Sequence, residues 1–197
     1  PFFTIGVFFI CFKLAVKHGF SKLNSIYLAL AFFLGSVFSY IVIDSESWYF
    51  SQSISALLVL LALYEYFTKR RFFLVGIFTS LAFATRFTSG LVILFFLADI
   101  FLKKDFSLEK RFFTVFKLIA PSMIVGVLLL AYNFARFGDA FNNGYETNLV
   151  VPQAFQLVRA RYGLFSLSHL ITNFFWFFLA SMIPITEFGS YHLVAPY

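Results

Sequence analysis

The sequence is poor in charged residues and has a single cysteine. Asp, Glu, Lys and Arg together make up 12% of its 197 residues, whereas 61% are hydrophobic and the mean hydropathy is +0.88. A soluble domain carries about 25% charged residues, so this chain lacks the polar side chains to cover itself in water. Cys11 alone excludes a disulfide or a thiolate metal site within the chain. The three histidines have no metal-ligand spacing. The composition therefore predicts a protein embedded in lipid.

The charges that are present lie between the apolar runs. The net charge is +6, and short basic clusters such as Lys69-Arg70-Arg71 follow the positive-inside pattern of membrane proteins. This placement argues against nucleic acid as a partner. We predict an all-α fold, a polytopic transmembrane helical bundle of about six spans. The protein would be a multi-pass integral membrane protein of the plasma or inner membrane, or of the endoplasmic reticulum in a eukaryote.

A span needs about 20 apolar residues, and the apolar runs define where the spans are expected. The expected transmembrane bundle covers 1–133, and an extracytoplasmic loop with an interfacial or seventh helix at 170–185 covers 134–197. The whole is expected to be one domain and an internal piece of a longer protein. The individual spans are expected at 1–16, 26–43, 51–67, 72–102 (a pair) and 112–133.

The stretch 72–102 has basic clusters at both ends, so both flanks are expected on the cytoplasmic side. Two helices of about 14 residues each would rise only about 21 Å, less than the roughly 30 Å hydrocarbon core. We therefore predict a short helical hairpin whose tip, around Arg86, lies at membrane depth in a polar cavity. Thr88 or Ser89 is expected to cap the following helix, so that the helix end and Arg86 could bind a phosphate. The structural alternative is that the Arg86 side chain snorkels, with its charged head reaching the water, or that it pairs with Asp44 or Glu46.

The outer loops hold the remaining candidate residues. Asp44 and Glu46 could share a divalent cation such as Mg²⁺ or Mn²⁺, bind an acceptor hydroxyl, or simply be solvated acids. Glu65 and Asp99 lie near cytoplasmic helix ends, where they are expected either to snorkel to the surface or to pair with nearby basic residues. Three further residues are candidates for binding a lipid phosphate or an acidic acceptor: Arg159, Arg161 and His169. The remaining candidates form a loop motif: Asn133, Arg136, Asp139, Tyr145 and Glu146.

Three segments in order resemble the polytopic GT-C glycosyltransferases, a group that includes protein mannosyltransferases, aminoarabinosyltransferases and oligosaccharyltransferases. They are 72–88 (FFLVGIFTSLAFATRFT), 132–145 (YNFARFGDAFNNGY) and 162–168 (YGLFSLS). The chain departs from the family pattern at Phe87 and Ala140, where proline is usual.

The resemblance implies transfer of a sugar from a polyprenyl-phosphate donor to a glycan, lipid or protein acceptor on the extracytoplasmic face, among membrane lipids. It places the catalytic carboxylate in an outer loop ahead of Pro1, so the catalytic residue is unknown in this chain. It also matches Arg86 to the hairpin arginine of the family. The alternatives are a polytopic transporter, although no inverted repeat is found, and an inactive relative of these enzymes.

Overall fold

The computed structural model describes residues 2–43, 47–103, 107–142 and 144, and six single positions further on (161, 166, 167, 169, 170 and 174). The chain divides into two units, 1–144 and 145–197. Every element described in the first unit is helical, which confirms the all-α prediction for these residues. The elements are α1 (Phe2–Lys17), α2 (Lys22–Gly35), α3 (Phe38–Ile43), α4 (Ser47–Thr68), α5 (Phe72–Thr85), the 3₁₀ helix η1 (Phe87–Val92), α6 (Ile93–Leu102) and α7 (Leu108–Phe137).

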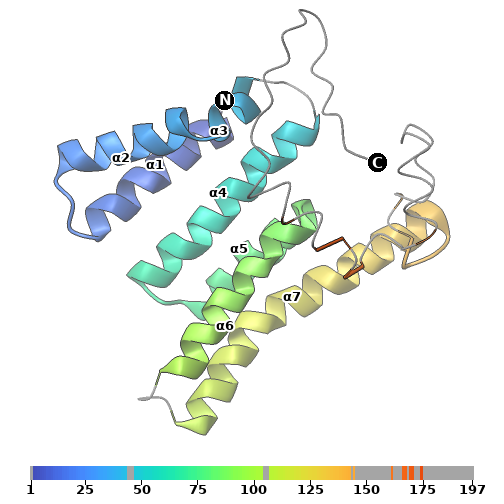
Figure 1. Ribbon diagram of the computed structural model, residues 1–197. Helices are drawn as coiled ribbons and strands as arrows, with labels where there is room; N and C mark the ends of the chain where they lie inside the picture. The colour runs from blue at the N-terminus through green and yellow to red at the C-terminus, as the bar shows by residue number, and fades with distance from the viewer. Residues whose placement is uncertain are drawn as a thin grey trace, which may run out of the picture. The chain divides into compact units, whose positions relative to one another are not determined.

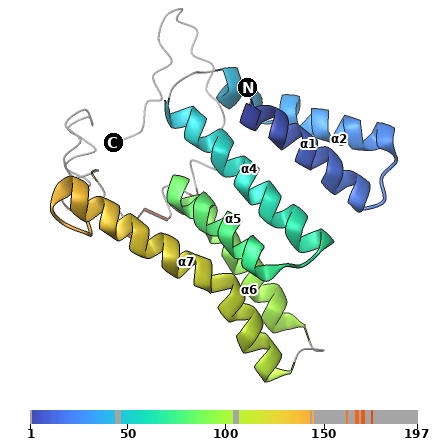
Figure 2. The same ribbon diagram turned by 180° about the vertical axis from the view of Figure 1, so that it is seen from behind.

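The long helices of the first unit pack side by side in the order α2, α1, α4, α5, α7, and α6 lies beside α7 (Figures 1 and 2). The chain reverses direction after α1, after α4, at the turn between α5 and α6, and after α6 (Figures 1 and 2). As a result, the α1–α2, α4–α5 and α6–α7 connections lie toward one end, which we call the basic end (17–22, 69–71, 103 and 107–111). The buried core joins α4, α5, α6 and α7 through Ala62, Tyr66, Val75, Phe96, Ile100 and Leu118.

Among the described residues, two helices are long and apolar enough to cross a membrane: Tyr49–Thr68 of α4 and all of α7. Large apolar side chains on α7 remain exposed, with Met123, Val127 and Leu128 between 63% and 65% accessible. Such a surface fits lipid better than water. The other helices of the bundle are shorter, so the expected count of about six spans stays a prediction.

The span expected at 26–43 stays a prediction, and the structure divides it into two helices. The chain forms α2 and then α3, with a break at Ser36. The Ser36 hydroxyl donates to the carbonyl of Phe32 at 2.6 Å and accepts from the amide of Phe38 at 3.2 Å. A serine side chain that bonds locally to the backbone competes with the helical hydrogen bonds. It therefore ends one helix and starts the next.

Helices α5 and α7 approach each other most closely at Gly76. A Cβ atom on Gly76 would clash with the backbone carbonyl oxygen of Leu118 and would lie 3.1 Å from Cγ of Pro121. One turn further, the hydroxyls of Ser80 and Ser122 are 2.8 Å apart. Small residues that allow close backbone contact, together with hydroxyl hydrogen bonds, are typical of helix pairs in membranes.

The predicted hairpin at 72–102 is present. Helix α5 has 14 residues, which corresponds to about 21 Å, and the chain returns through η1 and α6 to the basic end. There Lys103, which follows α6, bonds to Tyr66 of α4 at 3.3 Å. Gly90 allows the turn to fold back tightly, because a Cβ there would lie 2.6 Å from Cβ of Phe83.

We expect Gly76→Ala to destabilise the fold by about 1–3 kcal/mol, the range for overpacking, because its methyl group would meet backbone that cannot rotate away. The matched control is Gly126→Ala on α7, where no atom lies within 4 Å of the added carbon. Alanine should be neutral or stabilising there, by up to about 1 kcal/mol. Denaturant unfolding in detergent measures both, and equal effects would contradict the close approach of α5 and α7.

Candidate functional site

Arg86 occupies the tip of the hairpin, between α5 and η1. Its backbone is extended (φ −149, ψ 114), and its amide closes α5 by donating to the carbonyl of Ala82 at 2.8 Å. The guanidinium reaches across to α4, where Nε donates to Oγ of Ser51 at 3.0 Å. The side chain is half-buried. A charged group is thus held where three helical segments meet.

Ser51 is the first of two serines on the face of α4 that looks toward α5. Ser55 follows one turn later and is buried, and its hydroxyl has no hydrogen-bond partner among the described residues. Buried polar atoms nearly always have a partner, so this hydroxyl stands out in the apolar helix, one turn from the contact of Ser51 with Arg86. The serine pair was not singled out from the sequence, although polar residues four apart in an apolar helix are the signal that could have found it.

The hairpin tip lies short of the ends of both flanking helices. Gly76 faces Leu118 and Ser80 bonds to Ser122, so the two parallel helices α5 and α7 keep a constant register. In that register Arg86 lies level with Leu128, and α7 continues to Phe137, which is about 14 Å further at 1.5 Å per residue. On the α4 side, Ser51 lies about 6 Å from the first residue of that helix.

Thr88 does not cap a helix, and that prediction is wrong. The chain enters η1 directly after Arg86, so Thr88 and Ser89 lie inside the 3₁₀ helix. Neither η1 nor α6 has a side-chain cap, and the residue before α6 is Val92. Thr88 is exposed. A phosphate bound at this corner would therefore depend on Arg86 rather than on a capped helix end.

Asn133 and Arg136 lie on α7 and not in a loop, because the helix runs past its expected end to Gly138, whose φ of 73 terminates it. Asn133 donates to the carbonyl of Ala140 at 3.2 Å, and the Asp139 carboxylate accepts from the amide of Phe141 at 2.9 Å. The exposed Arg136 lies over the ring of Phe137 at 5.0 Å. Within the described residues, no hydrogen bond or ion pair joins this turn to Arg86.

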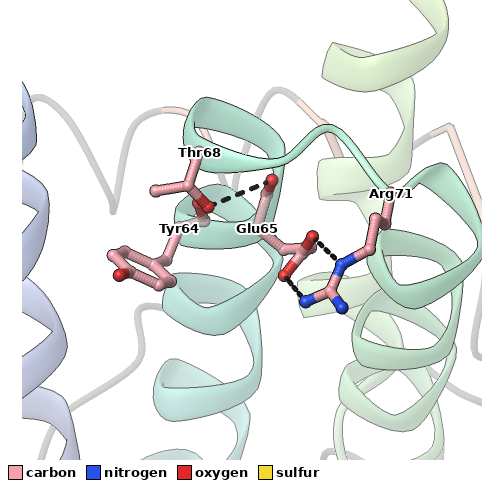
Figure 3. A network of polar contacts seen from close by, with 4 residues as sticks. All are labelled: Tyr64, Glu65, Thr68 and Arg71. Carbon is pink, nitrogen blue, oxygen red and sulfur yellow. Dashed lines mark hydrogen bonds and ion pairs between the residues drawn. The ribbon is translucent and has the colours of Figure 1, made fainter.

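Glu65 and Asp99, two of the acids near the basic end, are paired with basic neighbours. Glu65 is only 6% exposed and accepts two parallel hydrogen bonds from Arg71, at 2.6 and 2.7 Å (Figure 3). These hydrogen bonds raise the pKa of the Arg71 guanidinium above its ordinary value. Asp99 bonds to Lys103 at 2.5 Å. The first pair joins the end of α4 to the start of α5, and the second lies at the end of α6.

Several candidates lie outside the described residues: Asp44, Glu46, Tyr145, Glu146 and Arg159. Arg161 and His169 are isolated described positions in the second unit, whereas Arg86 lies in the first. Among the described residues there is no group of three or more His, Cys, Asp or Glu that could hold a metal ion.

Comparison with known proteins identifies no relative. No family model, curated protein or solved structure matches the chain.

We expect Arg71→Ala to destabilise the protein by about 1–3 kcal/mol, the cost of a buried acceptor without its donor, because Glu65 would remain buried. Lys69→Ala, which removes an exposed cation two residues away, should change stability by no more than about 0.5 kcal/mol. Thermal unfolding in neutral detergent compares the two. Equal shifts would show that the pair contributes nothing beyond surface charge.

Proposed function

We propose that this chain forms part of a multi-pass membrane glycosyltransferase that transfers a sugar from a polyprenyl-phosphate donor. The proposal rests on the resemblance of the three segments to GT-C enzymes and, above all, on one observation: Arg86 lies at the tip of a short hairpin, hydrogen-bonded to Ser51. An arginine with a planar fork of donors suits the oxygens of a phosphate.

The location of Arg86 suits a lipid-linked donor. The tip lies below the ends of α4 and α7, and exposed apolar side chains surround it, including Phe87 and Leu91 at 49% and 52%. A polyprenyl tail can stay among such side chains in lipid, while its phosphate needs a polar contact. The two serines of α4 extend that polar contact toward the basic end.

In the proposed reaction a carboxylate takes the proton of the acceptor hydroxyl as the hydroxyl oxygen attacks the anomeric carbon. The bond between that carbon and the phosphate oxygen breaks, and its electron pair leaves on the lipid phosphate. Arg86 stabilises this departing charge. The resemblance assigns the carboxylate to an outer loop outside residues 1–197, and Asp44 with Glu46 remain candidates for acceptor or metal binding.

We expect Arg86→Ala to lower sugar transfer by about 100-fold or more, the usual effect of removing one group that stabilises transition-state charge. Arg86→Lys should restore part of the activity because it keeps the charge but not the fork. Transfer is measured in membranes that contain the full-length protein, with a panel of polyprenyl-phosphate sugars.

Lys117→Ala is the control, since it removes an exposed cation of α7 that lies over the ring of Phe113 on its own helix at 4.1 Å. It should leave transfer and elution in gel filtration unchanged. Full activity of Arg86→Ala would refute the phosphate role. Retained binding of polyprenyl phosphate by the unmodified full-length protein, without transfer of any sugar, would instead identify an inactive relative.

A further inference from the structure

The basic end carries more positive charge than its acids can neutralise. Two contacts bring its connections together. The ring of His18, after α1, lies edge-on against the ring of Phe67 in α4, with 4.9 Å between centroids. Arg111 of α7 donates to the carbonyl of Lys103, after α6, at 2.7 Å. The described basic residues there are Lys17, Lys22, Lys69, Arg70, Arg71, Lys103, Lys110 and Arg111, and the described acids are Glu65, Asp99 and Glu109.

Two of these acids are already used. Glu65 pairs with Arg71 and Asp99 with Lys103. Four further cations at the α1–α2 and α4–α5 connections are exposed, and within the described part of the chain none of them makes an ion pair: Lys17, Lys22, Lys69 and Arg70.

Arg70 has a backbone conformation that favours glycine. Its φ is +52, and it is the one described non-glycine residue with positive φ. The amides of Lys69 and Arg70 both donate to the Glu65 carbonyl, at 3.1 and 2.9 Å, which ends α4. A left-handed residue at this place is normally glycine, and a side chain there is strained. Elsewhere the chain obeys the rule, with glycine at Gly19 (φ 89) and Gly138 (φ 73).

Exposed apolar side chains border the free cations and indicate what they meet. Phe20 and Leu23 flank the first loop at 48% and 76% exposure, and Phe73 follows the second at 47%. A soluble anion or a nucleic acid would leave these side chains in water. Charge next to apolar surface is the pattern of the membrane interface, where anionic headgroups attract basic residues.

We propose that Arg70 and Lys69, with Lys17 and Lys22, bind the phosphate groups of anionic phospholipids in the leaflet at the basic end. The strain at Arg70 is then tolerated because glycine would keep the turn but lose a phosphate contact. This inference rests on the membrane placement of α4 and α7 and does not depend on sugar transfer at Arg86.

The Arg70→Gly variant removes both the backbone strain and the positive charge, and measurements in two kinds of vesicle separate the two effects. The full-length protein is placed in vesicles of phosphatidylcholine alone, or of phosphatidylcholine with phosphatidylglycerol, and its thermal unfolding and retained lipids are measured. In phosphatidylcholine the variant should be more stable than the unmodified protein, because the backbone strain is removed. Its preference for phosphatidylglycerol should fall about five-fold, which corresponds to one lost contact of about 1 kcal/mol.

Two further arms make the result decisive. Lys17→Gln with Lys69→Gln should lower the same preference without any gain in stability, and Arg136→Gln on α7 should leave it unchanged. An unchanged preference in Arg70→Gly and in the double variant would overturn the proposal. So would soluble inorganic phosphate, if it replaced phosphatidylglycerol in stabilising the unmodified protein. The transfer activity of Arg86→Ala has no bearing on either outcome.

Discussion

The close contact of α5 with α7 determines where the rest of the hairpin can lie. In lipid, helices gain little by burying apolar side chains against each other, so their association depends on packing and polar contacts. Gly76 lets the backbone of α5 reach the carbonyl of Leu118, and the hydrogen bond between Ser80 and Ser122 fixes the register. A side chain at position 76 would push α5 away and release both contacts.

This register sets the height of the hairpin tip. Because α5 has only 14 residues and begins level with the first turns of α7, it ends well before the 30-residue α7 does. Gly90 then turns the chain back against Phe83. Arg86 is the last residue before the turn, so its depth follows from the length of α5. The bond to Ser51 orients the guanidinium once it is there.

The sequence could predict the hairpin because two basic clusters flank an apolar stretch too short for two full spans. Pairing of Glu65 and Asp99 with nearby cations followed from the same charge pattern. The break at Ser36 and the 3₁₀ turn after Arg86 could not be predicted, because each depends on local hydrogen bonds that hydropathy does not register. The longer course of α7 was missed for a related reason: Asn133 and Arg136 are polar, yet the helix continues until Gly138 stops it.

The two arginines at positions 71 and 86 show how differently the same side chain is used. Arg71 binds a buried carboxylate through both arms of its fork, and such a pair is a structural contact that joins α4 to α5. Arg86 donates through Nε to a neutral hydroxyl. A hydroxyl can orient a guanidinium without cancelling its charge, so the contact with Ser51 positions this side chain. The buried hydroxyl of Ser55 one turn below extends the same polar face, and this combination is the physical reason to look for the donor phosphate at the hairpin tip.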